Sequence, residues 1–96
     1  MSRRAVFKFR LYVAGEAQNS AEAVANLTAL CRMHLHDRHV IEVVDVFREP
    51  KRALADGIFM TPTLVKLSPP PVRRIVGTLS QTQPVLQALG LQTFAV

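Results

Sequence analysis

The alternation of apolar and polar residues in the first half of the chain predicts a strand, a helix and a second strand. Apolar and polar side chains alternate over Ala5–Val13, which is typical of a strand with one face in the core. A helix is expected next, with Asn19 as its N-cap and Glu22 completing a capping box. Its apolar stripe follows helical spacing and consists of Val24, Leu27, Cys31, His34 and Leu35.

The segment Val40–Val46 is apolar on both faces, which favours a central strand covered by helices. We therefore expect Ile41 and Val43 to join Phe7, Phe9 and Leu11 in the core. A short helix is predicted over Pro50–Ala55, because proline is tolerated in the first turn and Gly57 can follow as a C-cap.

Two short runs rich in β-branched residues, Thr63–Leu67 and Val72–Val76, predict a pair of strands. The connection between them contains Pro69, Pro70 and Pro71, which cannot donate hydrogen bonds to a strand ladder. A final helix is expected after Ser80, with Ser80 as its cap, Gln83 at the capping-box position and Gly90 at its end.

These elements follow the order βαβαββα within one α/β domain that spans residues 1–96. A right-handed βαβ unit gives a parallel pair of strands, and the later hairpin adds an antiparallel pair. This is the thioredoxin-like arrangement. In that fold a cis bond precedes the third strand, so we predict that Thr61–Pro62 is cis.

The charge distribution favours an acidic partner. The chain has 96 residues and a net charge of +5, and arginine and lysine crowd the N-terminal segment at Arg3, Arg4, Lys8 and Arg10. After Asp56 the only charged side chains are Lys66, Arg73 and Arg74, all within the predicted hairpin. We therefore predict that these three residues contact a partner, although an ordinary hairpin with a solvated face would show the same pattern.

Several other classes of protein are disfavoured by composition. One tyrosine and no tryptophan offer little for stacking bases, so an acidic protein surface fits better than nucleic acid. No run reaches the roughly 20 apolar residues of a membrane span, and the start lacks the apolar core of a signal peptide. The expected location is the cytoplasm.

No set of residues predicts an enzyme, a cofactor or a metal site. The position of a thioredoxin redox pair, Gly15–Ser20, contains no cysteine, and Cys31 lies on the apolar helix stripe. The histidines at 34, 36 and 39 lack matched ligands and suit a helix C-terminus. Asp45, Glu49 and Asp56 have no nucleophile near them in sequence, so ordinary surface charge is expected. The glycines are too scattered for a phosphate-binding loop.

Several motifs resemble the KaiB family of circadian clock proteins. They are Leu11–Gly15 with Asn19 and Ser20, Val44–Val46, Thr61–Leu64, and Pro69–Gly77 with Leu79 and Ser80. The resemblance covers about residues 6–91 in the same order. The triple proline followed by Val72, Arg73, Arg74 and Ile75 is its most specific part.

The resemblance implies a regulator without enzymatic activity that binds the ATPase ring of KaiC and opposes the activator KaiA. In the family it competes with a sensor histidine kinase that carries a similar domain. The alternative for this chain is a KaiB-like sensory or adaptor module that docks on a histidine kinase or another signalling protein.

The family also implies two folds. A ground state ordered βαββααβ forms dimers and tetramers, and a thioredoxin-like monomer binds KaiC. The rearranged half contains Pro62, Pro69, Pro70 and Pro71, so these are the candidate switch prolines. Slow isomerisation of X–Pro bonds would make such a switch slow.

This chain departs from the family pattern in two places. Ala88 and Gly90 stand where the family commonly has Gly and Asp, and alanine favours helix over glycine by about 1 kcal/mol. The given sequence also lacks the acidic C-terminal tail of many cyanobacterial members. This leaves open whether the protein serves a full oscillator with KaiA or a reduced clock or stress-response system.

Overall fold

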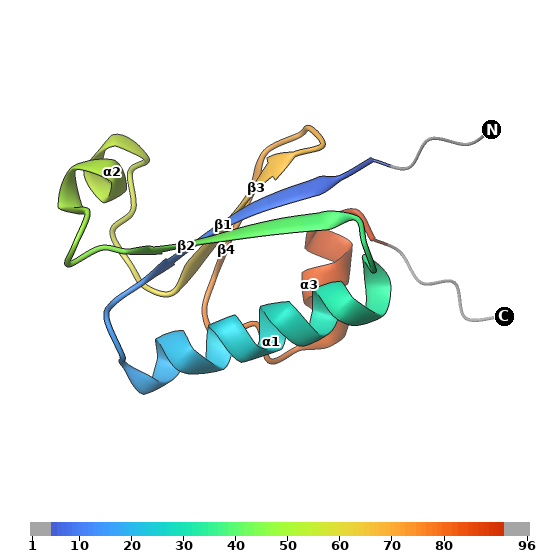
Figure 1. Cartoon of the computed structure of the whole chain (residues 1–96), viewed down its shortest axis with the longest axis horizontal. Helices are drawn as coiled ribbons and strands as arrows, with labels where there is room; N and C mark the ends of the chain where they lie inside the picture. The colour runs from blue at the N-terminus through green and yellow to red at the C-terminus, as the bar shows by residue number, and fades with distance from the viewer. Residues whose placement is uncertain (1–4, 92–96) are drawn as a thin grey trace, which may run out of the picture.

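A computed structural model describes residues 5–91, and the order of its elements is the predicted βαβαββα (Figure 1). The elements are β1 (Phe7–Val13), α1 (Gln18–His34), β2 (His39–Asp45), α2 (Pro50–Ala55), β3 (Thr63–Ser68), β4 (Arg73–Val76) and α3 (Thr82–Ala88). Arg3 and Arg4, from the predicted basic cluster, lie outside the described residues.

The four strands form one sheet in the order β2-β1-β3-β4. β1 pairs with β2 in parallel and with β3 antiparallel, and β3 pairs with β4 antiparallel, as the element order predicts. In Figure 1 the helices α1 and α3 lie on one face of the sheet, and α2 lies beyond one end of the strands. The arrangement is thioredoxin-like rather than βαββααβ.

Two groups of buried side chains occupy the two faces of the sheet. The larger group packs under α1 and α3 and includes the predicted core residues Phe7, Phe9 and Leu11. The smaller group lies on the α2 side and consists of Tyr12, Val44, Ala53, Ile58 and Val65. Ala53 is the only buried residue of α2, so this helix contributes little apolar area.

The prediction that Val40–Val46 forms a central strand was wrong, because β2 is an edge strand. Ile41 packs partly against the core, but the Val43 side chain is 48% exposed and Val40 is exposed as well. The hairpin joins the sheet on the far side of β1, so β1 and β3 are the two interior strands. Sequence pattern alone does not encode that choice.

The predicted helix caps were also wrong at two N-termini. α1 begins at Gln18 with Ala17 before it, and Asn19 is an exposed residue within the helix. The Ser20 hydroxyl instead accepts a hydrogen bond from the Ala14 backbone N–H at 3.0 Å. α3 begins at Thr82 with no side-chain cap, so Ser80 lies outside the helix.

The proline-rich connections agree with the predictions. The Thr61–Pro62 bond is cis, and so are Ser68–Pro69 and Pro70–Pro71. Pro69, Pro70 and Pro71 join β3 to β4. Pro62 is buried, and its carbonyl accepts a hydrogen bond from the Gly77 N–H at 2.9 Å. Within residues 5–91, no helix has the length and apolar character needed to cross a membrane.

Candidate functional site

The candidate site lies where β4 passes the C-terminal end of α2. Arg73 and Arg74 are neighbours on β4, and both are exposed. The Arg74 guanidinium donates to the backbone carbonyls of Asp56 and, at 3.4 Å, of Gly57. Carbonyls at a helix C-terminus carry the negative end of the helix dipole and favour a cation there. Arg74 therefore fastens β4 to α2, whereas Arg73 has no ion pair among the described residues.

Lys66 does not lie on this surface, contrary to the prediction that it is displayed with the two arginines. Its side chain is 4% exposed, and Nζ lies 3.4 Å from the Leu89 carbonyl oxygen and 5.8 Å from the centre of the Phe7 ring. Loss of hydration, with a smaller contribution from Arg73, lowers the pKa of Lys66. Alternation correctly places Lys66 on the opposite face from Val65, but α3 covers that face.

Large apolar side chains surround Arg74 and were missed by the sequence analysis. Phe59 is 87% exposed, Met60 is 62% exposed and Val76 is 55% exposed. A hollow of about 190 Å³ lies between them, lined by Gly57, Ile58, Phe59, Met60, Thr63, Arg74 and Val76. The signal was present as two bulky apolar residues in a short loop bounded by Gly57 and Pro62. We call Phe59, Met60, Arg74 and Val76, together with Arg73 on the other face of the same strand, the β4 surface.

A network of ion pairs holds α2 beside the sheet. Arg10 on β1 contacts Glu42 at 2.9 Å and Asp56 at 3.0 Å, and Arg52 on α2 contacts Glu42 at 2.9 Å. The buried Tyr12 hydroxyl donates to the same Asp56 carboxylate. The hydrogen bond from Tyr12 lowers the pKa of Asp56 most, and the bond from Arg10 lowers it by a smaller amount. Arg10 and Arg52 lower the pKa of Glu42.

The carboxylates that the sequence analysis interpreted as ordinary surface charge therefore have structural roles. Asp56 joins α2 to β1, and Glu49 pairs with Arg52 at 3.1 Å. Asp45 Oδ1 accepts hydrogen bonds from the backbone N–H groups of Gly15, at 3.1 Å, and Phe47, at 2.9 Å. None of them faces a nucleophile in the described part of the chain.

The thiol and imidazole groups are also placed in structural positions. Cys31 is fully buried in the core, and burial raises the pKa of its thiol to about 11. The thiolate needed for exchange chemistry is therefore scarce at neutral pH. His39 Nδ1 lies 2.8 Å from the Leu35 carbonyl oxygen, and His36 lies 3.3 Å from the Asp37 carboxylate.

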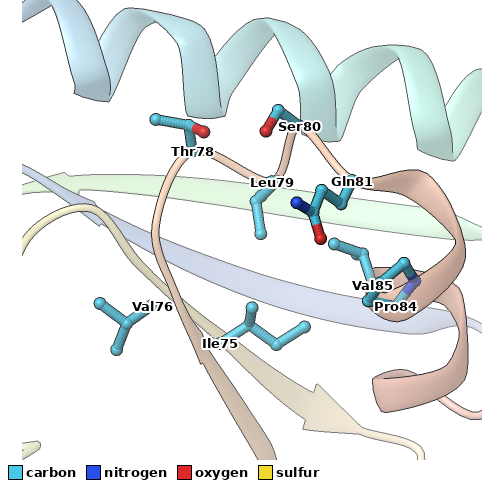
Figure 2. A pocket seen from close by; sticks show the side chains of 8 residues that line it. All are labelled: Ile75, Val76, Thr78, Leu79, Ser80, Gln81, Pro84 and Val85. Atoms are coloured by element: carbon cyan, nitrogen blue, oxygen red, sulfur yellow. The ribbon is translucent and has the colours of Figure 1, made fainter.

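A second hollow, of about 280 Å³, lies where β4 leads into α3 (Figure 2). Leu79 and Gln81 extend into it, and Ile75 and Pro84 are among the residues that line it. Among residues 5–91, none that lines this hollow has an acidic or basic side chain. The Asn26 side chain donates to the Thr78 carbonyl at 2.8 Å and ties this connection to α1. The described part of its lining therefore offers packing space rather than acid–base chemistry.

Comparison with known proteins identifies the family, since the model of the KaiB domain matches residues 10–91. The chain belongs to the KaiB family. The match contains the motifs Leu11–Gly15, Thr61–Leu64 and Pro69–Gly77. Both arginines of the β4 surface and its apolar residues therefore lie within the KaiB domain.

Curated KaiB proteins are similar over most of their length. The circadian clock protein KaiB3 of Synechocystis sp. is 42% identical over 82 residues, which cover 85% of this chain and 80% of that protein. The circadian clock oscillator protein KaiB of Prochlorococcus marinus is 43% identical over 91 residues, which cover 95% of this chain and 76% of that protein.

Solved structures confirm that this KaiB-family chain has a thioredoxin-like fold. The N-terminal domain of Synechococcus elongatus SasA superposes with a TM-score of 0.71 at 19% identity, covering 100% of this chain and 94% of that one. Chloroplastic thioredoxin z superposes with a TM-score of 0.75 at 18% identity, covering 92% of this chain and 80% of that one. At such low identity the likeness concerns the fold alone.

Proposed function

We propose that this KaiB-family protein is a non-enzymatic regulator that binds a KaiC-type ATPase ring and modulates its phosphorylation and clock output. The observation that carries the proposal is the thioredoxin-like arrangement, which in the family is the form that binds KaiC. The curated relatives, named as circadian clock proteins, support the same class of function.

The β4 surface is the proposed contact with the ring. Arg73 supplies a cation without a carboxylate partner among residues 5–91, and Phe59 and Met60 supply exposed apolar area. Arginine and aromatic residues with surrounding apolar contacts are typical of the energetic centre of protein interfaces. Lys66 is buried behind this surface, so its contribution is structural in this fold.

The absence of a redox pair supports a regulator over a thioredoxin-like enzyme. Gly15–Ser20 contains no cysteine, and Cys31 is enclosed by the core. A protein with this arrangement regulates its partner by binding. A dithiol-exchange assay is expected to detect no activity.

The test measures binding of the purified KaiC-type ATPase ring from the same genome to the full chain by biolayer interferometry. Arg73→Ala is the informative variant, because Arg74 also holds α2 and its removal would disturb the fold. Loss of one member of a desolvated charge pair costs about 2–5 kcal/mol, so binding should weaken at least about 30-fold. Arg32→Ala, an exposed arginine on α1, is the matched control and should bind as the wild type does. A wild-type chain that does not bind the ring would contradict the proposal.

The fold likeness to the SasA N-terminal domain favours one alternative, a sensory or adaptor module that docks on a histidine kinase or another signalling protein. A pull-down with this chain as the bait, which tests the proteins encoded in the same genome, separates the two functions. Capture of a KaiB-like-domain histidine kinase without the ATPase would support the alternative, whereas competition between the two for the chain would support the ring-binding function.

Self-association in a βαββααβ ground state, as dimers or tetramers, belongs to the same proposal. In it, residues from Pro50 onward rearrange, with Pro62, Pro69, Pro70 and Pro71 in the rearranged part. Sedimentation velocity over a range of protein concentrations tests for such oligomers, and a monomer at every concentration would contradict this part of the proposal.

A further inference from the structure

β4 leaves one edge of the sheet open. It is the last strand in the order β2-β1-β3-β4, and of residues 5–91 none pairs with its outer side (Figure 1). An open edge presents backbone N–H and C=O groups that can pair with another chain. The strand is only four residues long, so few groups are available.

The pairing register shows which backbone groups face outward. Pro62 and Gly77 stand opposite each other in the β3–β4 ladder, and the Gly77 N–H donates to the Pro62 carbonyl at 2.9 Å. Hydrogen-bonded and non-hydrogen-bonded pairs alternate along an antiparallel ladder. The backbone groups of Arg73 and Ile75 therefore point toward β3, whereas those of Arg74 and Val76 point toward the open edge.

The side chains beside this edge favour a particular occupant. Arg74 and Val76 share a face with the 190 Å³ hollow between Phe59 and Met60, which is large enough for one apolar side chain. Arg73 faces the opposite side, where it would attract a carboxylate. No aspartate or glutamate follows Asp56 in the chain, so the hairpin itself contains cations and no anions.

We propose that the edge of β4 takes an extended acidic segment of a partner protein as an added antiparallel strand. The segment would pair with the backbone of Arg74 and Val76, place an apolar side chain in the hollow and place a carboxylate near Arg73. Strand addition obtains affinity from main-chain hydrogen bonds and specificity from alternate side chains. The identity of the partner that supplies this segment rests on the ring-binding function proposed above.

A second copy of this chain is a poor occupant. Antiparallel pairing of two β4 strands would bring Arg73 and Arg74 of both copies close together, and like charges directly opposite on paired strands are destabilising. Cations on an edge strand are also a common means of preventing such pairing. The positive charge of Arg73 and Arg74 therefore favours an acidic partner over a second copy of this chain.

The first experiment uses a synthetic peptide that alternates glutamate and valine over six residues, titrated into the isotope-labelled full chain. In the antiparallel pairing, residues with side chains over the hollow direct their N–H groups toward β4. N-methylation of the valines should therefore weaken binding at least about tenfold, and N-methylation of the glutamates should have little effect. The largest amide shifts should occur at Arg74 and Val76.

A lysine–valine peptide of the same length is the charge control and should not bind. Any other ranking of the two methylated peptides would overturn the proposal, and so would equal binding of the lysine peptide. Amide shifts confined to β2, the opposite edge, would also overturn it.

The second experiment changes the protein. Val76→Pro removes the outward N–H without removing a bond to β3, and Val76→Thr keeps both the N–H and the side-chain volume. Proline is tolerated on an edge strand where its nitrogen faces solvent. Val76→Pro should bind the peptide and the ATPase ring about tenfold more weakly than Val76→Thr, with unchanged amide spectra outside residues 72–78.

The outcomes separate this proposal from the function above. Peptide binding that depends on Val76 without any binding of the ring would contradict the ring-binding function and keep strand addition. Equal binding of the ring to Val76→Pro and Val76→Thr, with no peptide binding, would overturn strand addition and keep the function.

Discussion

Tyr12→Phe removes the hydroxyl group that donates to the Asp56 carboxylate and leaves the buried ring in place. Tyr12 is fully buried on β1, and Asp56 follows the last residue of α2, so this bond joins the helix to the centre of the sheet. A hydrogen bond to a charged group contributes about 1.5–3 kcal/mol. The Asp56 side chain is one-third exposed and also accepts from Arg10 at 3.0 Å, so water and arginine replace part of the loss. We expect a decrease of about 1.5 kcal/mol in the free energy of unfolding at pH 7.

The decrease should depend on pH in a defined direction. The pKa of Asp56 is lowered in the folded protein, whereas an unfolded aspartate titrates near pH 4. The stabilisation is therefore complete above about pH 4 and is lost as the pH falls through the lowered folded pKa. Urea unfolding followed by far-ultraviolet circular dichroism at pH 7 and near pH 3 measures the difference between wild type and variant.

A double-mutant cycle with Asp56→Asn isolates the pair, and its coupling energy should be about 1 kcal/mol at pH 7. Asp37→Asn is the control, because Asp37 is exposed and far from α2 in sequence, and asparagine suits its positive φ of 58°. No coupling in the cycle, or the same loss at both pH values, would refute this account of how α2 is held.

Two further variants test the region beyond α2. Lys66→Met should raise the free energy of unfolding by about 1–2 kcal/mol, because it replaces a buried ammonium with an apolar side chain. In the wild type, stability should rise as pH increases from the lowered folded pKa of Lys66 toward about 10.4, because the unfolded state binds more protons in that window. Lys66→Met should remove this rise. Urea unfolding at pH 7 and pH 9.5 measures the stability and its pH dependence, and a less stable variant would contradict the prediction. Ala88→Gly weakens the last turn of α3 by up to about 1 kcal/mol and should increase the population of a second, slowly exchanging conformer that differs from about Pro50 to Leu91. Two-dimensional amide NMR detects it, and one identical set of peaks in wild type and variant would show that this protein does not switch.

The hairpin shows how far local pattern carries the prediction of the site. Short β-branched runs on either side of Pro69, Pro70 and Pro71 were sufficient to predict β3 and β4 and to place Arg73 and Arg74 on the second of these strands. Alternation also put Lys66 on the opposite face from Val65. Whether that face is open or covered depends on α3, which is distant in sequence, so the burial of Lys66 was not predictable from the pattern.

Phe59 and Met60 illustrate the reverse case. Two large apolar residues in a loop read as ordinary core residues, because burial is the usual fate of such side chains. Their exposure follows from the position of α2 and of the open β4 edge, both set by long-range pairing. The ion pairs of Arg10 with Glu42 and Asp56 likewise join residues 32 and 46 positions apart.

The sequence by itself determined the order and type of the elements, the parallel and antiparallel pairings, the cis bond at Pro62 and membership of the KaiB family. These depend on local periodicity, on proline chemistry and on short motifs, all of which are readable over a few residues. Only the tertiary structure decided that β1 is an interior strand and β2 an edge, that Lys66 is buried, and that Arg74 is bonded to the end of α2. Each of these depends on which distant segment packs against a given face, and the free energy of that choice is shared among many contacts rather than encoded in one stretch of chain.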